Sequence, residues 1–265
     1  MPVTFAFLDS GTGGIPYMQY LKQHCPESSC VYLADSAHFP YGTKTPEQVI
    51  QSASECISLI IRKWNPQAII IACNTISVTA LGVLRRLYPQ VPIVGTVPAI
   101  KLAAKLSQKR VIGLLATQGA VQHPYVQQLK DDFASDCRLV MRGDTDLVSF
   151  VEHKFFTSTK EERLWAVRPA VDFFTEQGCD AIVLGCTHFV HLVSEFEEAA
   201  GQGIHIVDSR EGVVRQALTV VRKNTGSVQN GILSAAADFL QEKPADQALY
   251  TTGFFNTADV AEYRA

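Results

Sequence analysis

Two cysteines stand at similar places in the chain, each directly after a short apolar run. Cys73 follows Ile69–Ala72, and Cys186 follows Ala181–Gly185, 113 positions further on. Short runs of Ile, Val and Leu are typical of strands that are buried on both faces. In both places a polar residue and an amphipathic stretch come next. The sequence therefore predicts that one thiol is presented at the end of a buried strand, and that the arrangement occurs twice.

Two facing thiols suit a reaction that removes a proton from one face of a carbon and returns one to the other. One sulfur must be a thiolate and the other a thiol, and both can be cysteines because racemisation is a symmetric reaction. The pKa of a thiol can be brought near the operating pH. A single cysteine is more often a buried structural residue, but two at equivalent positions favour a catalytic pair. A disulfide between them is the alternative, although redox pairs usually lie close in sequence.

The other cysteines carry no such pattern. The chain has 7 cysteines, an odd number, and none of them forms a Cys-x-x-Cys pair. A disulfide framework, a zinc knuckle and any other metal site are therefore not expected. The cysteines that we interpret as small buried apolar residues are Cys25, Cys30, Cys56, Cys137 and Cys179.

The composition is that of an ordinary globular protein. Hydrophobic residues make up 47% of the 265 residues, charged residues 18%, and the net charge is −3. A bulk nucleic-acid partner would call for a basic stripe, which is absent. No apolar run approaches the roughly 20 residues that span a bilayer, and the N-terminus has no basic export signal. We expect a cytoplasmic protein that binds neither nucleic acid nor membrane; the oligomeric state stays open, with a homodimer as one option.

Strand-like and helix-like segments alternate along the chain. Laid over itself at an offset of 107, the chain places Leu8–Ser10 on Leu115–Thr117, and an offset of 113 superposes the two cysteine motifs. The pattern predicts an α/β fold of two pseudo-symmetric parallel-sheet domains with the active site in the cleft between them. We expect residues 1–97 with 208–265 to form the N-terminal domain and residues 98–207 the C-terminal domain. The expected strands are 3–9, 31–35, 68–72, 92–95, 111–115, 138–141, 181–185, 205–207 and 249–252.

Polar side chains gather where these strands end, which is where parallel sheets bind ligands. Hydroxyl and amide donors, with free N–H groups at helix starts, could hold a carboxylate. Asp9 and Asp35 could hold an ammonium group or tune a thiol. His188, two residues after Cys186, could stabilise charge or accept a proton; packing alone is the other interpretation, as a turn is for Asp35. The further strand-end residues expected in the cleft are Ser10, Asn74, Thr75, Thr117 and Thr187.

A glycine-rich loop allows a different hypothesis. Gly11-x-Gly13 resembles part of a dinucleotide fingerprint, with Asp35 where a ribose-binding acid would stand, but Pro16 occupies the third glycine position. A tight strand-to-helix turn explains the loop more simply. A nucleotide- or amino-acid-binding regulatory protein without chemistry stays open as the alternative, and the phosphate-binding G-x-x-x-x-G-K-[ST] pattern is absent.

Four motifs in this order resemble those of the glutamate racemases, within the aspartate/glutamate racemase family. The resemblance runs from about residue 3 to residue 222, with the interdomain segment at 94–101 and a late strand from residue 249. The related aspartate and hydantoin racemases and a decarboxylating relative are alternatives. The presence of both cysteines favours racemisation over one-thiol decarboxylation, and Asn74-Thr75 with Thr187-His188 favours glutamate. The motifs are Leu8–Gly14, Pro40–Gly42, Ala72–Thr75 and Gly185–His188.

The resemblance implies a cofactor-independent enzyme that interconverts L- and D-glutamate through two thiols and supplies D-glutamate for peptidoglycan. Cys73 would act on the D enantiomer and Cys186 on the L enantiomer, assisted by Asp9 and His188 respectively. Glu152 stands where the family has an acidic residue. The residues implied to bind substrate are Ser10, Pro40, Tyr41, Gly42, Asn74, Thr75 and Thr187, and Thr117 is added from its place at a strand end.

The chain departs from the family pattern at several positions. Ala120 replaces a common threonine, so part of the contact expected with the substrate carboxylate is in doubt. Val190 and His191 stand where the family usually has proline and leucine, and Arg210 replaces a small residue. These changes are expected to alter the surroundings of the site without removing an essential group.

Overall fold

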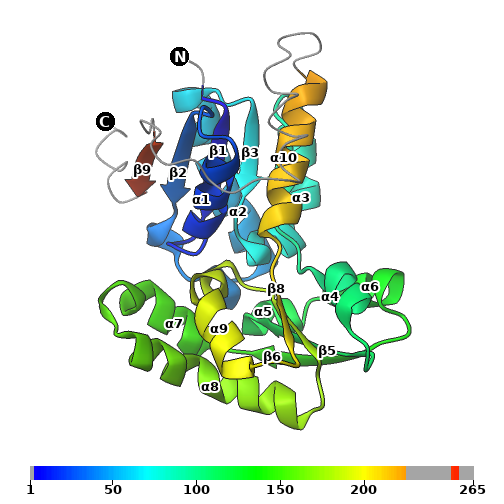
Figure 1. Ribbon diagram of the computed structural model, residues 1–265. Coiled ribbons are helices and arrows are strands. Elements are labelled where there is room, and N and C mark those ends of the chain that lie inside the picture. Colours follow the sequence, from blue (N-terminus) through cyan, green and yellow to red (C-terminus); the bar gives the residue numbers. More distant parts are fainter. Residues whose placement is uncertain (1–2, 225–251, 257–265) are drawn as a thin grey trace.

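A computed structural model of the chain describes residues 3–224 and 252–256. Two parallel sheets, each covered by helices, lie one above the other in Figure 1. The blue and cyan part of the chain forms the upper half, the green and yellow part forms the lower half, and the orange helix α10 returns to the upper half. The fold is the two-sheet α/β architecture that the sequence predicts.

The first sheet has the order β4-β3-β1-β2-β9 among the described residues, and every neighbouring pair is parallel. Each residue of β1, β2 and β3 is buried, because helices cover both faces and the strands carry apolar side chains throughout. The strands are β1 (Phe5–Asp9), β2 (Cys30–Ala34), β3 (Ala68–Ile71), β4 (Ile93–Gly95) and β9 (Thr252–Asn256).

The second sheet repeats this plan with the order β6-β5-β7-β8. Its central strand β5 corresponds to β1, and β7 corresponds to β3, so the cysteine-bearing strand lies beside the central strand in both sheets. The internal similarity seen in the sequence thus reflects two copies of one strand order. The strands are β5 (Val111–Ala116), β6 (Arg138–Gly143), β7 (Ala181–Leu184) and β8 (His205–Val207).

The helices begin and end where the local chemistry dictates. Thr45 and Gln48 form a capping box at the start of α2, and Asn65 ends this helix in the left-handed conformation with φ 40°. The α-helices are α1 (Ile15–His24), α2 (Pro46–Trp64), α3 (Asn74–Leu87), α4 (Ile100–Leu106), α5 (Gln118–Val121), α6 (Pro124–Phe133), α7 (Thr145–His153), α8 (Lys160–Glu176), α9 (Val193–Ala200) and α10 (Arg210–Asn224). Short 3-10 turns are η1 (Ser36–His38), η2 (Tyr41–Thr43), η3 (Phe155–Thr157) and η4 (Thr187–Leu192).

Two helical segments are interrupted. The segment 120–134 divides into α5 and α6, because Pro124 starts a new helix and the His123 side chain caps it by accepting from Tyr125 N. The segment after Cys186 first forms the 3-10 turn η4, and the α-helix begins only at Val193. The described part of the expected late strand begins at Thr252 and continues to Asn256 as β9, and residues 249–251 lie outside the described part.

Helix α10 and strand β9, the last described elements, belong with the first sheet. Helix α10 buries Val214 and Ala217 in the same apolar cluster as Phe5 and Tyr17, and β9 pairs with β2. These contacts agree with grouping residues after 208 with the N-terminal domain. The domain boundaries themselves stay predictions.

Candidate active site

Cys73 and Cys186 occupy equivalent positions at the carboxyl ends of β3 and β7. Each is the residue before a helical turn, with φ −141° and ψ 117° for Cys73 and φ −130° and ψ 135° for Cys186. Their exposed fractions are only 6% and 4%. Both side chains line the same small cavity between the two halves. The fold therefore brings together two thiols that are far apart in sequence.

That cavity collects most of the residues predicted for the site. Its volume of about 20 Å³ is room for about one water molecule. An amino acid is several times larger, so the residues around the cavity must move to admit one. The lining residues are Ser10, Phe39, Pro40, Tyr41, Gly42, Cys73, Asn74, Thr75, Thr117, Val148, Cys186, Thr187 and His188.

Cys73 lies beside a carboxylate. Burial raises the pKa of its thiol well above the usual 9.0, and the charge of Asp9 and a hydrogen bond to Asp9 raise it further. Asp9 is fully buried, and burial raises the pKa of this carboxyl from 3.8 to about 6, against the lowering effect of His188. The first half of the site thus favours a neutral Cys73 thiol.

Cys186 lies beside a buried ion pair. Its Sγ is 3.8 Å from His188 Nδ1, and His188 Nε2 donates to Glu152 Oε2 at 2.9 Å. Burial opposes protonation of His188, yet its hydrogen bonds to Cys186 and Glu152 raise the imidazole pKa from 6.5 to about 10. Burial would also raise the pKa of Glu152, but hydrogen bonds from His188 and Thr12 lower it to about 2. A positive imidazolium therefore faces the Cys186 sulfur.

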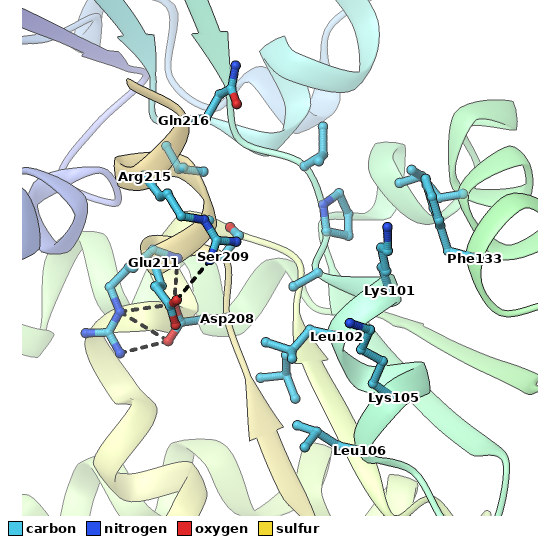
Figure 2. Close-up of a pocket in the computed structure, with 18 of the residues that line it drawn as sticks. Lys101, Leu102, Lys105, Leu106, Phe133, Asp208, Ser209, Glu211, Arg215 and Gln216 are labelled. Carbon is cyan, nitrogen blue, oxygen red and sulfur yellow. Dashed lines mark hydrogen bonds and ion pairs between the residues drawn. The ribbon is translucent and has the colours of Figure 1, made fainter. Parts of the chain in front are cut away.

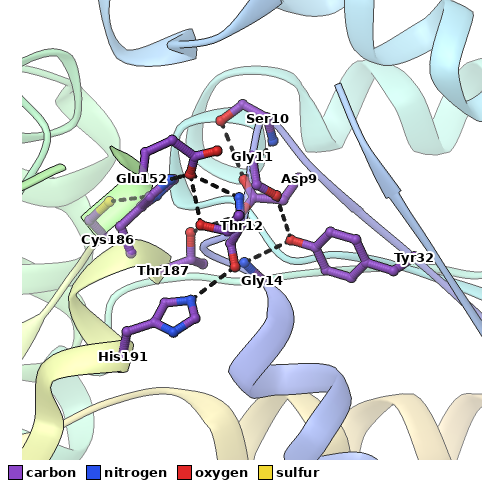
Figure 3. A network of polar contacts seen from close by, with 11 residues as sticks. Asp9, Ser10, Gly11, Thr12, Gly14, Tyr32, Glu152, Cys186, Thr187 and His191 are labelled. Atoms are coloured by element: carbon purple, nitrogen blue, oxygen red, sulfur yellow. Dashed lines mark hydrogen bonds and ion pairs between the residues drawn. The ribbon is translucent and has the colours of Figure 1, made fainter. Parts of the chain in front are cut away.

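The glycine loop after β1 is where the two halves meet. A Cβ on Gly11 would lie 2.6 Å from both carboxylate oxygens of Glu152, and one on Gly13 would lie 2.5 Å from His188 Nδ1. Thr12 N and Oγ1 both donate to Glu152 Oε2, at 2.9 and 2.8 Å (Figure 3). The loop needs glycine because Glu152 and His188 occupy that space. The same space is not open to the phosphates of a nucleotide.

Asp35 lies outside the cavity lining and holds the turn that follows β2. It is fully buried, it accepts a hydrogen bond from Tyr41 Oη, and His38 Nδ1 is 2.9 Å from its Oδ1. Tyr41 itself lines the cavity, after a cis Phe39–Pro40 peptide bond. Asp35 therefore orients the Pro40–Gly42 turn, and its carboxylate is not available to a ribose.

Polar groups around the two sulfurs can hold an amino acid. Asn74 Nδ2 donates to Thr96 O at 3.2 Å, while Asn74 Oδ1 is buried and has no hydrogen-bond partner among the described residues. Thr75 Oγ1 and Thr117 Oγ1, from opposite halves, lie 3.3 Å apart. Helix α3 begins directly after Cys73, and the N–H of Ile76 in its first turn hydrogen-bonds to the Cys73 side chain; the N–H groups of a first helical turn can also bind an anion. The site thus offers both acceptors for an ammonium group and donors for a carboxylate.

Several residues that contribute to the site were not predicted from the sequence. Phe39 and Val148 line the cavity, Thr12 holds Glu152, and Tyr32 accepts from Gly14 N while donating to Gly11 O at 2.8 Å. Thr12 could have been identified from the sequence, since it lies inside the Leu8–Gly14 motif. The others act through contacts between segments far apart in sequence.

The departures from the family pattern fall around the cavity and not in it. Ala120 is buried and its N–H donates to Thr117 Oγ1 at 3.2 Å. Val190 packs into the apolar cluster of the first half, although it belongs to the second. His191 donates across the same boundary, to Thr12 O. These residues therefore shape how the halves meet.

A larger groove lies on another face, between α4 and the β8–α10 connection (Figure 2). Its volume is about 920 Å³, and it contains neither cysteine of the site. The predicted interdomain segment forms part of its wall through Val97, Pro98 and Lys101. Arg210 lies here, with Nη2 2.7 Å from Asp208 Oδ2, so this departure is remote from the two thiols.

No cluster of three or more metal-ligating side chains is present within residues 3–224 and 252–256. Across the same residues, no helix combines the length and the apolar character that a bilayer crossing requires.

Comparisons with known proteins place the chain among racemases. The model of the Asp/Glu/Hydantoin racemase family matches residues 17–217. The chain belongs to this family. A glutamate racemase from Treponema pallidum is 43% identical over 214 residues, covering 81% of this chain and 80% of that protein. One from Shewanella piezotolerans is 39% identical over 220 residues, covering 82% and 80%.

Solved structures of the family have the same fold. The Escherichia coli glutamate racemase, crystallised with L-glutamate and the activator UDP-MurNAc-Ala, has a TM-score of 0.76 and 26% identity, with 96% of this chain and 98% of that chain covered. The family membership indicated by the four motifs is confirmed, and so is the two-sheet fold. The chain is therefore an enzyme of the racemase family and not a binding module without chemistry.

Proposed function

We propose that this protein is a glutamate racemase that uses Cys73 and Cys186 as its two acid–base groups and no cofactor. The observation that carries the proposal is the shared cavity, which both thiols line from equivalent strand ends of the two halves. The substrate follows from the glutamate racemases at 43% and 39% identity. The orphan acceptor Asn74 Oδ1 suits the ammonium group, and the threonines of both halves suit the carboxylates.

The charges around the thiols suggest how the reaction starts. The imidazolium of His188 stabilises negative charge on Cys186, whereas Asp9 keeps Cys73 protonated. Cys186, as thiolate, removes the α proton of L-glutamate, and the Cys73 thiol delivers its own proton to the opposite face. This step leaves a Cys186 thiol and a Cys73 thiolate, which is the state that removes the α proton of D-glutamate in the reverse reaction. A second turnover of L-glutamate requires that Cys186 lose a proton and Cys73 regain one through solvent. Negative charge that develops on the substrate carboxylate is met by N–H groups at the start of α3.

Substitution of either thiol tests the proposal. Replacing Cys73 or Cys186 with serine should lower racemisation of L- and D-glutamate by about 10²–10⁴-fold, because a hydroxyl is a poor base at neutral pH. Cys179 is the matched control, since it is a buried cysteine just before the same strand β7, and Cys179→Ser should leave the rate nearly unchanged. Normal turnover by Cys73→Ser, without pyridoxal phosphate, would refute the two-thiol mechanism.

The substrate and the physiological role have separate tests. Turnover of L-aspartate at a rate equal to that of L-glutamate would favour the aspartate racemase branch instead. The proposed role, supply of D-glutamate for peptidoglycan in the bacterial cytoplasm, predicts that the gene restores growth of a D-glutamate auxotroph. The Cys73→Ser and Cys186→Ser genes should fail to do so.

A further inference from the structure

His191 reaches from the second half of the protein to the first. It lies in the 3-10 turn η4, and its Nε2 is 2.9 Å from the carbonyl oxygen of Thr12 in the loop after β1 (Figure 3). A carbonyl oxygen can only accept, so Nε2 carries the proton and donates it. Burial lowers the pKa of His191, which keeps the ring neutral. The contact is a hydrogen bond between neutral groups across the boundary of the halves.

The ring of His191 is also held by aromatic neighbours. Its centroid lies 5.0 Å from that of Phe155 and 5.8 Å from that of Phe156. These residues come from η3, so three segments of the chain meet at His191. The hydrogen bond and the aromatic packing are thus two separate contributions, which different substitutions can remove.

Thr12 connects His191 to the ion pair beside Cys186. While its carbonyl accepts from His191, its N–H and hydroxyl donate to Glu152 Oε2, and the same oxygen accepts from His188 Nε2. His188 Nδ1 in turn faces Cys186 Sγ at 3.8 Å. The hydrogen bonds lead from His191 through Thr12 and Glu152 to His188, and the backbone from His188 to His191 closes the ring. Hydrogen bonds arranged in such a chain orient and polarise one another.

We propose that His191 is a positioning residue that fixes the Thr12 carbonyl and thereby holds Glu152 and His188 in place beside Cys186. The inference rests on the proposed two-thiol function for its catalytic meaning. Cys73 lies beside Asp9, which His188 influences only through its charge, so the hydrogen bonds that His191 supports act most directly on the Cys186 side of the cavity.

Two substitutions separate hydrogen bonding from packing. His191→Gln keeps an N–H donor and loses the ring, whereas His191→Phe keeps an aromatic ring against Phe155 and Phe156 and loses the donor. The readout is the rate of iodoacetamide alkylation at Cys186 relative to Cys73 in the same molecule, measured by mass spectrometry of the full-length protein. Cys73 serves as the internal control for any change in how the cavity opens.

We expect His191→Phe, and not His191→Gln, to lower the reactivity of Cys186 relative to Cys73. His191→Phe should lower the Cys186-to-Cys73 alkylation ratio at pH 7 by about tenfold, the equivalent of one hydrogen bond, while His191→Gln should stay within about threefold of wild type. In glutamate turnover, kcat should follow the same order with KM little changed. An unchanged ratio in His191→Phe, or an equal or larger loss in His191→Gln, would overturn the inference. Absent turnover in the wild type would instead refute the proposed function, and the alkylation ratio would still decide the role of His191.

Discussion

Glu152 offers the clearest test of the electrostatics around Cys186. Its Oε2 accepts from Thr12 N, Thr12 Oγ1 and His188 Nε2, all within 2.9 Å. Glu152→Gln keeps the shape and an acceptor oxygen but removes the charge. Hydrogen bonds to a charged group are worth about 1 kcal/mol more than those between neutral groups, which gives about 3 kcal/mol for three bonds. The neutral side chain of the Glu152→Gln variant would not incur the cost of burying the Glu152 charge, which offsets part of this loss. We therefore expect the free energy of unfolding to fall by about 1–3 kcal/mol.

The loss should depend on pH in a defined direction. The pKa of His188 is raised from 6.5 to about 10 in the folded protein, so its contribution is complete below pH 6.5 and disappears as pH rises towards 10. The pKa of Glu152 is lowered from 4.5 to about 2, so its contribution is complete above pH 4.5 and disappears at lower pH. The ion pair therefore stabilises the fold most between these limits, and the effect of Glu152→Gln should shrink at pH 9.

Urea unfolding of the wild type and the variant at pH 5.5 and pH 9 measures this difference. Glu198→Gln is the matched control, because Glu198 pairs with Lys160 at 2.7 Å but is half exposed; exposed pairs contribute little, about 0–1 kcal/mol. A loss for Glu152→Gln that is the same at both pH values, or no larger than that of Glu198→Gln, would refute the reasoning about the ion pair.

Two further substitutions test one loop at the site and one loop away from it. Gly11→Ala should push Glu152 away and lower glutamate turnover by about tenfold or more, because the new Cβ would lie 2.6 Å from the carboxylate oxygens of Glu152. The control Gly212→Ala has nothing within 4 Å of its new Cβ and should leave the rate unchanged. Equal rates in both variants would contradict the steric argument. Asp180→Ala removes the acceptor of the Gln108 and Lys109 N–H groups, each at 2.7 Å, and should lower the free energy of unfolding by about 2–4 kcal/mol. Its kcat should stay near wild type, and an unchanged urea midpoint would count against the prediction.

The sequence was informative where local chemistry determines structure. The apolar runs predicted β3 and β7 and placed Cys73 and Cys186 after them. Local chemistry also sets the ends of α2 in the structure, where Thr45 caps the helix and Asn65 ends it in the left-handed conformation. Pro124 acts locally in the same way, because the structure starts the new helix α6 at this residue after α5 has ended.

What the sequence could not supply are the contacts between distant segments. Thr12 and Glu152 are 140 positions apart, and His191 and Thr12 are 179 apart. Neither pairing has a local signal, because it depends on how one half docks on the other. The glycines of the loop were readable as a turn, but the reason for them, the Glu152 carboxylate and the His188 ring, became visible only in three dimensions.

The direct test of the two-thiol mechanism is to follow the α hydrogen during racemisation in D₂O. The reaction would start from L-glutamate and be stopped before it has gone a tenth of the way to equilibrium. Both enantiomers would then be separated and analysed for deuterium at Cα. Two bases on opposite faces predict that the D-glutamate formed carries deuterium, while the remaining L-glutamate keeps its hydrogen. D-Glutamate that retains the original hydrogen would show that one group serves both faces and would contradict the mechanism.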